Sequence, residues 1–187
     1  SSNERPGITG LTHLFEHMMF KGTHAIGTKD IARDLQIIDE QERLQEKIRG
    51  LYVAQEARWR RGEIGDPFDP KSRPPELVEL EAQFQQLVEE QRALMIKDEF
   101  DKIYSEAGGS SMNASTNRDM TTYYITVPSN KLELWFWLES DRLQNLVLRE
   151  FYSERDVVHE ERRLRTESTP TGKFDEMFEA MLWQAHP

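Results

Sequence analysis

The longest regular pattern in the sequence lies between residues 30 and 107, where apolar residues recur at helical spacing among charged ones. The apolar positions are Ile31, Leu35, Ile38, Leu44, Ile48, Leu51 and Trp59, then Leu77, Leu80, Phe84, Leu87 and Leu94, with Gln91 in the same register. A Pro- and Gly-rich segment, RGEIGDPFDPKSRPP, separates the two halves. Heptad spacing interrupted by a turn predicts two long helices in an antiparallel hairpin. The hairpin either binds a partner or packs as a spacer, and we favour the spacer because heptad faces usually only pack.

The residues on either side of this segment mix strand and helix patterns. Tyr123, Ile125 and Val127 alternate with threonine and tyrosine, which is typical of a strand with one buried face. A TNRD turn joins this strand to the preceding SSMNAST stretch, so we expect two neighbouring antiparallel strands. Helices are expected over about residues 10–20, 130–146 and 150–167, and after residue 173.

These patterns predict an α+β fold. Residues 1–29 and 108–187 are expected to form part of a two-layer domain, in which helices cover an antiparallel sheet. Residues 30–107 are then largely an inserted antiparallel helical hairpin. Asp30 is expected to cap the first hairpin helix.

The composition restricts what the chain can do. With 37% hydrophobic residues, four Trp and nine Phe among 187 residues, the sequence is too apolar for a disordered chain. The net charge of −10 argues against nucleic acid as the main partner. The absence of cysteine excludes disulfides and thiolate metal sites, so that a metal must be bound by His, Asp, Glu or water. No apolar run is long enough to span a bilayer.

The segment HLFEHMMF, residues 13–20, places three ionisable side chains in an apolar helix. His13 and His17 are four residues apart, so they share one helix face and can both reach a single ion. Glu16 is displaced around the helix but stays beside that ion, where it can take a proton from a metal-bound water. The order H-x-x-E-H is the inverzincin signature. The alternative, two surface histidines beside a surface glutamate, is less well supported because three correctly ordered residues coincide.

A catalytic zinc site usually has a third protein ligand, and the best region for it is SERDVVHEERR. Glu154 and Glu161 are two helical turns apart and share a face, which Glu160 does not. We therefore predict Glu161 as the third ligand and Glu154 as a carboxylate that supports a histidine or the metal water. Taken alone, this segment would be interpreted as a solvated charged helix. The remaining histidines have no such spacing and are expected at the surface; they are His24, His159 and His186.

Three segments of the chain resemble the pitrilysin/insulinase-type zinc metallopeptidases, which include the mitochondrial processing peptidase subunits and many bacterial peptidases. They are ERPGITGLTHLFEHMMFKGT, GGSSMNASTNRDMTTYYITVPSNKLELWFWLESDRL and SERDVVHEERR, in the family's order. The resemblance implies one Zn²⁺ per active site, with His13, His17 and Glu161 as ligands, Glu16 as general base and Glu154 as the supporting glutamate. It also implies a substrate-binding edge strand, to which a peptide or unfolded polypeptide adds; its residues are Asn113, Ala114, Ser115 and Thr116.

The chain also departs from the family pattern. His17 and Glu161 are about twice as far apart as usual, and the excess matches the helical hairpin. The chain resembles a fragment of an N-terminal catalytic domain, whose clamshell is completed by a second homologous half or subunit. The resemblance favours the bacterial periplasm or cell envelope. Two alternatives stay open: a non-catalytic peptide-binding homologue, or a helical interaction module with a structural metal.

Overall fold

The computed structural model describes residues 4–5, 8–67 and 69–183, and it forms two compact units. Residues 28–96 form one, which we call the hairpin unit. Residues 1–27 and 97–187 form the other, which we call the mixed unit. The described chain is mostly helical with a single two-stranded antiparallel sheet, so the predicted α+β class is confirmed in this coarse form. None of the described helices is both long and apolar enough to cross a membrane.

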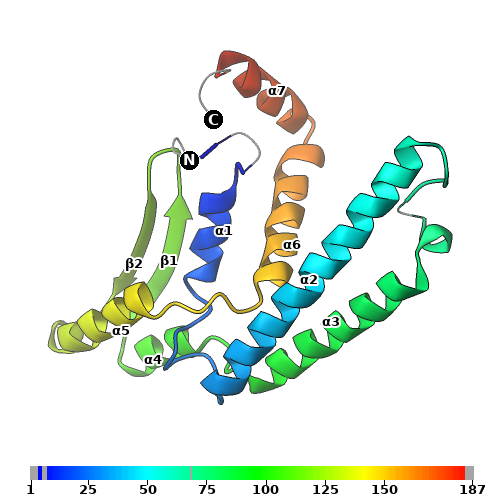
Figure 1. Ribbon diagram of the computed structural model, residues 1–187. Helices are drawn as coiled ribbons and strands as arrows, with labels where there is room; N and C mark the ends of the chain where they lie inside the picture. The colour runs from blue at the N-terminus through cyan, green and yellow to red at the C-terminus, as the bar shows by residue number, and fades with distance from the viewer. Residues whose placement is uncertain (1–3, 6–7, 68, 184–187) are drawn as a thin grey trace. The chain divides into compact units, whose positions relative to one another are not determined.

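The hairpin unit consists of α2 (Ile31–Arg60) and α3 (Pro75–Leu94), joined by a connection that contains a short 3-10 turn at Pro70–Ser72 (Figure 1). The predicted cap is confirmed, because the Asp30 carboxylate accepts a hydrogen bond from the Arg33 amide at 3.0 Å. Residues near the start of α2 contact the end of α3, and Tyr52 later in α2 reaches Glu81 early in α3. The two helices are therefore antiparallel, as predicted.

Ile48 is buried as predicted, but the buried face of α2 otherwise differs from the one the apolar residues predict. Leu35 and Trp59 are 39% and 50% exposed, whereas Ile37 is fully buried. The buried positions of the helix are Asp34, Ile37, Gln41, Ile48 and Gln55, which follow heptad spacing. Three of these are polar, and this is why a search for apolar residues selects a neighbouring face. Asp34 and Gln41 are accommodated by hydrogen bonds that cross to Gln91 on the partner helix, whereas Gln55 donates to the Ser72 carbonyl in the connection.

The second arm of the hairpin is shorter than the predicted segment, which extends to residue 107. The backbone becomes extended at Met95, and Asp98 has a positive φ of 53°. The next helix, α4 (Glu99–Glu106), belongs to the mixed unit. The heptad pattern continues in sequence across this break because α4 has an apolar face of its own, with Phe100 and Tyr104 buried.

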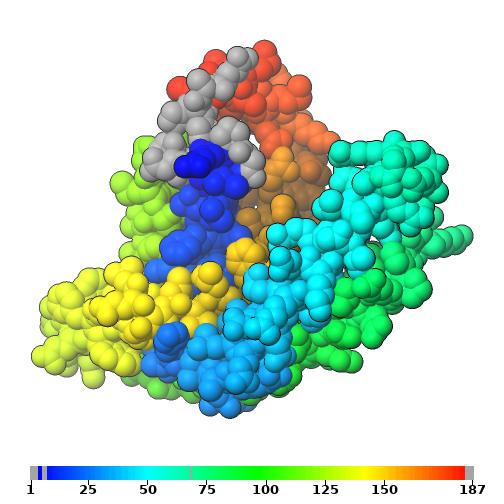
Figure 2. Space-filling model, in the orientation of Figure 1, coloured from blue at the N-terminus to red at the C-terminus, as the bar shows by residue number. Residues whose placement is uncertain are grey.

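The mixed unit contains α1 (Leu11–Met18), α4, α5 (Leu132–Gln144), α6 (Phe151–Arg162) and α7 (Gly172–Leu182), together with β1 (Ser110–Thr116) and β2 (Thr121–Thr126). The predicted strand pair is confirmed, with Asn113 opposite Tyr124 and Thr116 opposite Thr121. Helix α1 contacts β1, β2 and α6, so it lies between the sheet and α6 (Figure 1). In the space-filling view one face of α1, in blue, is open at the surface (Figure 2).

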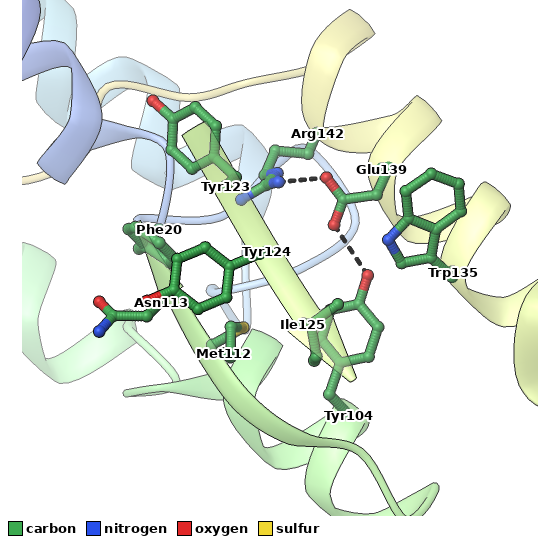
Figure 3. A pocket seen from close by; sticks show the side chains of 10 residues that line it. All are labelled: Phe20, Tyr104, Met112, Asn113, Tyr123, Tyr124, Ile125, Trp135, Glu139 and Arg142. Carbon is green, nitrogen blue, oxygen red and sulfur yellow. Dashed lines mark hydrogen bonds and ion pairs between the residues drawn. The ribbon is translucent and has the colours of Figure 1, made fainter. Parts of the chain in front are cut away.

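The core of the mixed unit joins one face of the sheet to α4 and α5. Ile26, Phe100, Tyr104 and Leu138 form its buried centre. Beside it the Glu139 carboxylate accepts hydrogen bonds from the Tyr104 hydroxyl, at 2.8 Å, and from Arg142 (Figure 3). Burial, assisted by the hydrogen bond to Glu139, raises the pKa of Tyr104 above its ordinary value. This polar cluster joins α5 to α4, and the Arg142 guanidinium also lies 4.8 Å from the centre of the Tyr123 ring on β2, so α5 is held against the sheet.

Candidate metal centre

Helix α1 presents His13 and His17 on one side because its adjacent face is anchored in the core. Leu14 and Met18 are buried, at 8% and 1% exposure. The two imidazoles, one helical turn apart, have ring centroids 4.9 Å apart and planes at 87°. Both rings are only partly buried, so they remain accessible from outside the fold.

The start of α1 is held by a carboxylate. Gly10 precedes the helix with a φ of 93° and provides no capping side chain. The Glu4 carboxylate accepts hydrogen bonds from the amides of Gly10, at 3.0 Å, and Thr12, at 2.7 Å. A negative charge at this end also complements the helix dipole, so Glu4 stabilises the turn that carries His13.

The loop after α1 is held by a buried arginine. Arg149 is fully buried and donates hydrogen bonds to the carbonyls of Lys21, Thr23 and Ile26 at 2.6 to 3.1 Å. Gly22 allows this packing, because it has a φ of 100° and a Cβ there would lie 2.3 Å from the Ile26 carbonyl oxygen. Since Arg149 immediately precedes the start of α6, the arginine ties the end of α1 to the beginning of α6.

Helix α6 brings Glu161 opposite the two histidines. Its Oε2 lies 3.5 Å from His13 Nε2, and its Oε1 lies 3.9 Å from His17 Nε2. One ligand atom from each of His13, His17 and Glu161 lies within 4.8 Å of the other two, a spacing that one metal ion can bridge. Among the described residues this is the group of three found at such a spacing. The structure thus brings together the three residues predicted as ligands.

The state of Glu161 indicates whether these residues fit a metal. Its Oε2 atom is buried and has no hydrogen-bond partner, and it is the one carboxylate oxygen in that condition in the described part of the chain. Leaving a buried carboxylate oxygen without a partner is costly. A cation among two imidazoles and a carboxylate would satisfy it, and this donor set is one that Zn²⁺ takes. The residues therefore fit a zinc ion.

Glu154 lies directly behind His17. Its Oε2 is 3.2 Å from His17 Nδ1, the ring nitrogen that does not face Glu161. Its Oε1 accepts a hydrogen bond from Lys21 Nζ at 2.6 Å, and Lys21 also reaches Glu150 at 3.0 Å. Burial acts to lower the pKa of Lys21, but the hydrogen bonds to Glu154 and Glu150 outweigh it, so the pKa is raised above its ordinary value.

Glu16 points toward the strand rather than into the group of ligands. Its Oε2 accepts a hydrogen bond from the Thr116 hydroxyl at the end of β1. That hydroxyl lies 2.9 Å from the Thr121 hydroxyl across the strand pair. Because the Thr116 hydroxyl has one hydrogen, its donation to Glu16 makes Thr121 the donor of the second contact. One oxygen of Glu16 is thus held by Thr116 beside the histidine helix, and its other oxygen, Oε1, does not take part in this hydrogen bond.

A pocket runs from α1 to the edge of the sheet. It is lined by His13, Glu16, Ala114, Ser115, Thr116 and Arg165. Arg165 lies in a π-helical turn, Arg163–Glu167, that follows α6, and its guanidinium is 3.6 Å from Glu161 Oε2. Turns of this kind occur often at functional sites. The pocket therefore joins the histidine helix to the strand predicted to bind substrate.

The four predicted substrate-binding residues alternate along β1. Asn113 and Ser115 are exposed, whereas Ala114 and Thr116 are half-buried and face α1. The Thr116 side chain therefore contacts Glu16 and not the outer face. Within the described residues the sheet is β1 and β2 alone, so the second edge of β1 has no neighbouring strand.

The other candidate residues lie apart from this site. His24 and His159 are exposed, as predicted, and so is Glu160; His186 lies outside the described residues. Sequence reasoning missed Lys21 and Arg165. The signal for Lys21 is a single cation at the end of the apolar stretch HLFEHMMF. Nothing distinguishes Arg165 from the other arginines of its charged helix.

The comparisons with known proteins bear on the second half of the chain. Residues 95–186 match the family model described as Insulinase (Peptidase family M16). The chain contains an M16 peptidase family domain. The matched residues include β1, Glu154 and Glu161, and they begin where the hairpin unit ends. The predicted family resemblance is confirmed.

One relative is named for its activity. The zinc protease PqqE of Helicobacter pylori (strain ATCC 700392 / 26695) is 41% identical over 91 residues, which are 48% of this chain and 20% of that protein. The match thus spans about a fifth of the relative's own length. No solved structure matches the chain. The family description and the name of this relative both denote peptidases.

Proposed function

We propose that this chain is the metal-binding part of a zinc-dependent endopeptidase that cleaves peptides or unfolded polypeptides. The observation that carries the proposal is the convergence of His13 and His17 on α1 with Glu161 on α6, where one buried oxygen of Glu161 has no hydrogen bond. A structural zinc site is closed by four protein ligands, whereas a catalytic site has three and an open position. The described residues offer three here, which favours catalysis.

In the proposed mechanism His13, His17 and Glu161 hold one Zn²⁺. When bound, zinc acts as a Lewis acid that acidifies water and polarises a carbonyl group. Glu16 accepts the proton of the water whose oxygen attacks the scissile carbonyl carbon, and then delivers it to the leaving amine as the carbon–nitrogen bond breaks. The hydrogen bond from Thr116 holds the Glu16 carboxylate in place for both transfers. Glu154 keeps the His17 ring oriented.

The substrate is proposed to bind as an added β-strand along the second edge of β1. Backbone hydrogen bonds to Asn113–Thr116 would hold an extended peptide and read its sequence only loosely. Support comes from the pocket, which connects this edge to His13 and Glu16. The exposed side chains of Asn113 and Ser115 are then free to contact alternate substrate residues.

The rest of the proposal concerns the complete protein. The two strands are taken as part of a two-layer domain whose antiparallel sheet is covered by helices, and the hairpin as an insertion into it. The start of the M16 match at residue 95, next to the end of the hairpin unit at Ile96, supports this assignment. A second homologous half or subunit is proposed to close over the substrate.

The decisive experiment replaces the proposed base. In the complete protein Glu16→Gln should lower peptide hydrolysis by about 100- to 10,000-fold, the range that a general base contributes, while zinc stays bound. Glu160→Gln is the matched control, because Glu160 is exposed on α6 and pairs with Arg163. Hydrolysis rates and zinc content are measured on the same preparations. Wild-type turnover in Glu16→Gln would show that the base is wrong, and a zinc-loaded wild type without turnover would favour a non-catalytic homologue.

A further inference from the structure

We propose that Lys21 is a positioning residue of the metal centre, which sets zinc affinity by holding Glu154 against His17. The inference rests on the proposed function, since it takes His17 as a zinc ligand. It adds a residue that contacts neither the ligand set nor the pocket beside it.

Lys21 lies between two carboxylates, those of Glu154 and Glu150. It follows α1 directly, and its Nζ lies 2.6 Å from Glu154 Oε1 and 3.0 Å from Glu150 Oε2. All three side chains are largely buried, with 19%, 15% and 18% exposure for Lys21, Glu154 and Glu150. An ion pair at this depth is screened less by solvent than an exposed one, so its geometry is better defined.

The contact with Lys21 orients the Glu154 carboxylate. The two oxygens of a carboxylate are rigidly connected, so holding Oε1 on Lys21 also directs Oε2 toward His17 Nδ1, 3.2 Å away. Glu150 immediately precedes α6, and the amide of Glu154, one turn later, donates a hydrogen bond to its carbonyl at 2.9 Å. Without a cation between the two carboxylates, their charges would repel. Replacing Lys21 would therefore let Glu154 turn away from His17.

Glu154 in turn acts on the proposed ligand atom, His17 Nε2. A neutral histidine that donates its Nδ1 hydrogen to Glu154 leaves the Nε2 lone pair free. His17 Nε2 is the atom that lies 3.9 Å from Glu161 Oε1, on the side of the proposed ligands. Carboxylates behind a ligating histidine fix its tautomer and ring orientation, and their loss weakens metal binding. Lys21 affects the orientation of the His17 ring indirectly, by holding Glu154.

The test measures zinc affinity in the complete protein by competition with a chromogenic chelator, so it does not depend on peptide hydrolysis. Lys21→Met should weaken zinc binding by about tenfold, the lower end of the effect of outer partners of a ligand. Lys21→Arg should restore most of the affinity, because it keeps the charge and the reach. Lys102→Met is the matched control, since Lys102 pairs with Glu106 at 3.9 Å on the exposed side of α4. Unchanged zinc affinity in Lys21→Met would overturn the inference.

A second comparison separates positioning from a general structural role. If Lys21 acts through Glu154, Lys21→Met should have no further effect on zinc affinity in a Glu154→Gln background. Glu150→Gln leaves the contact between Lys21 and Glu154 in place, so it should retain the affinity. If Lys21→Met lowered zinc affinity equally in the wild-type and Glu154→Gln backgrounds, positioning through Glu154 would be contradicted. The same would hold if Glu150→Gln lowered zinc affinity as much as Lys21→Met. A wild type without a tight zinc site would instead overturn the proposed function itself.

Discussion

Each unit of the chain gathers a group of polar side chains, which is buried in the hairpin unit and partly buried in the mixed unit, and the two groups are built on opposite principles. In the hairpin unit Gln91 donates a hydrogen bond to Asp34 at 2.9 Å and accepts one from Gln41 at 3.3 Å. In the mixed unit His13, His17 and Glu161 approach each other at 3.5 and 3.9 Å, and Glu161 Oε2 is left without a hydrogen bond. The first group pairs hydrogen-bond donors with hydrogen-bond acceptors. The second group brings together nitrogen and oxygen atoms whose lone pairs can bind a metal ion.

We propose that this difference separates polar groups that support a fold from polar groups that bind a ligand. A buried amide that bridges two helices fixes how they pair, because any other register would leave it unsatisfied. A set of imidazole and carboxylate groups that face one another without bonding gains nothing from folding alone. Such a set is maintained by its surroundings, here Glu154 behind His17 and Thr116 beside Glu16.

The largest effect in this comparison should come from the unsatisfied carboxylate. Glu161→Gln should weaken zinc binding by more than about 100-fold, because losing a ligand costs more than losing an outer partner. The unfolding free energy of the metal-free protein should change little, since the lost oxygen has no hydrogen bond. Chelator competition and urea unfolding measure the two quantities. Equal zinc affinity in Glu161→Gln and wild type would remove the distinction between the two groups.

The opposite outcome is expected for the satisfied group. Gln91→Leu removes one hydrogen bond to the buried Asp34 carboxylate and should lower the unfolding free energy by about 1–3 kcal/mol, because a buried charged group loses a donor. Zinc affinity should not change. The measurement is urea unfolding followed by the helical signal, together with the same chelator assay. A variant as stable as the wild type would mean that the amide contributes nothing to the pairing of α2 and α3.

The smallest effect should come from the neighbouring residue, Glu90, which accepts two hydrogen bonds from Arg33 at 2.6 and 2.9 Å but is 44% exposed. The hydrogen bond from Arg33 lowers the pKa of Glu90 below 4.5. The ion pair therefore contributes to the free energy of unfolding above pH 4.5, and this contribution is lost as the pH falls through the lowered pKa of Glu90. Glu90→Gln should be slightly less stable than wild type at neutral pH, and the two should converge in acid. A persistent difference in acid would contradict the ion pair as its source.

Much of the candidate site could be predicted from local spacing. His13 and His17 share a face of α1 because they are four residues apart, and Glu154 and Glu161 share a face of α6 because they are seven apart. The strand pair followed in the same way from alternation and a turn. Whether these residues act as ligands, base and substrate strand stays a prediction until the experiments above are done.

Less could be predicted where polar residues replace apolar ones or where contacts join distant segments. The buried face of α2 carries Asp34, Gln41 and Gln55, so apolar periodicity selected Leu35 and Trp59 instead. Lys21 and Glu154 are 133 positions apart, and no local pattern relates them. The break at Met95 was likewise hidden, because apolar residues continue at helical spacing into α4.

By itself the sequence determined which side chains share a face of α1, of α6 and of each strand, because helix and strand periods depend only on the backbone. It also determined that a metal in this protein would be held without thiolates, since there is no cysteine. Only the tertiary structure decided that α1 and α6 bring their faces together, with Glu154 behind one imidazole and Lys21 behind Glu154. The contact between His17 and Glu154 spans 137 positions, so packing of the whole mixed unit is needed to make it.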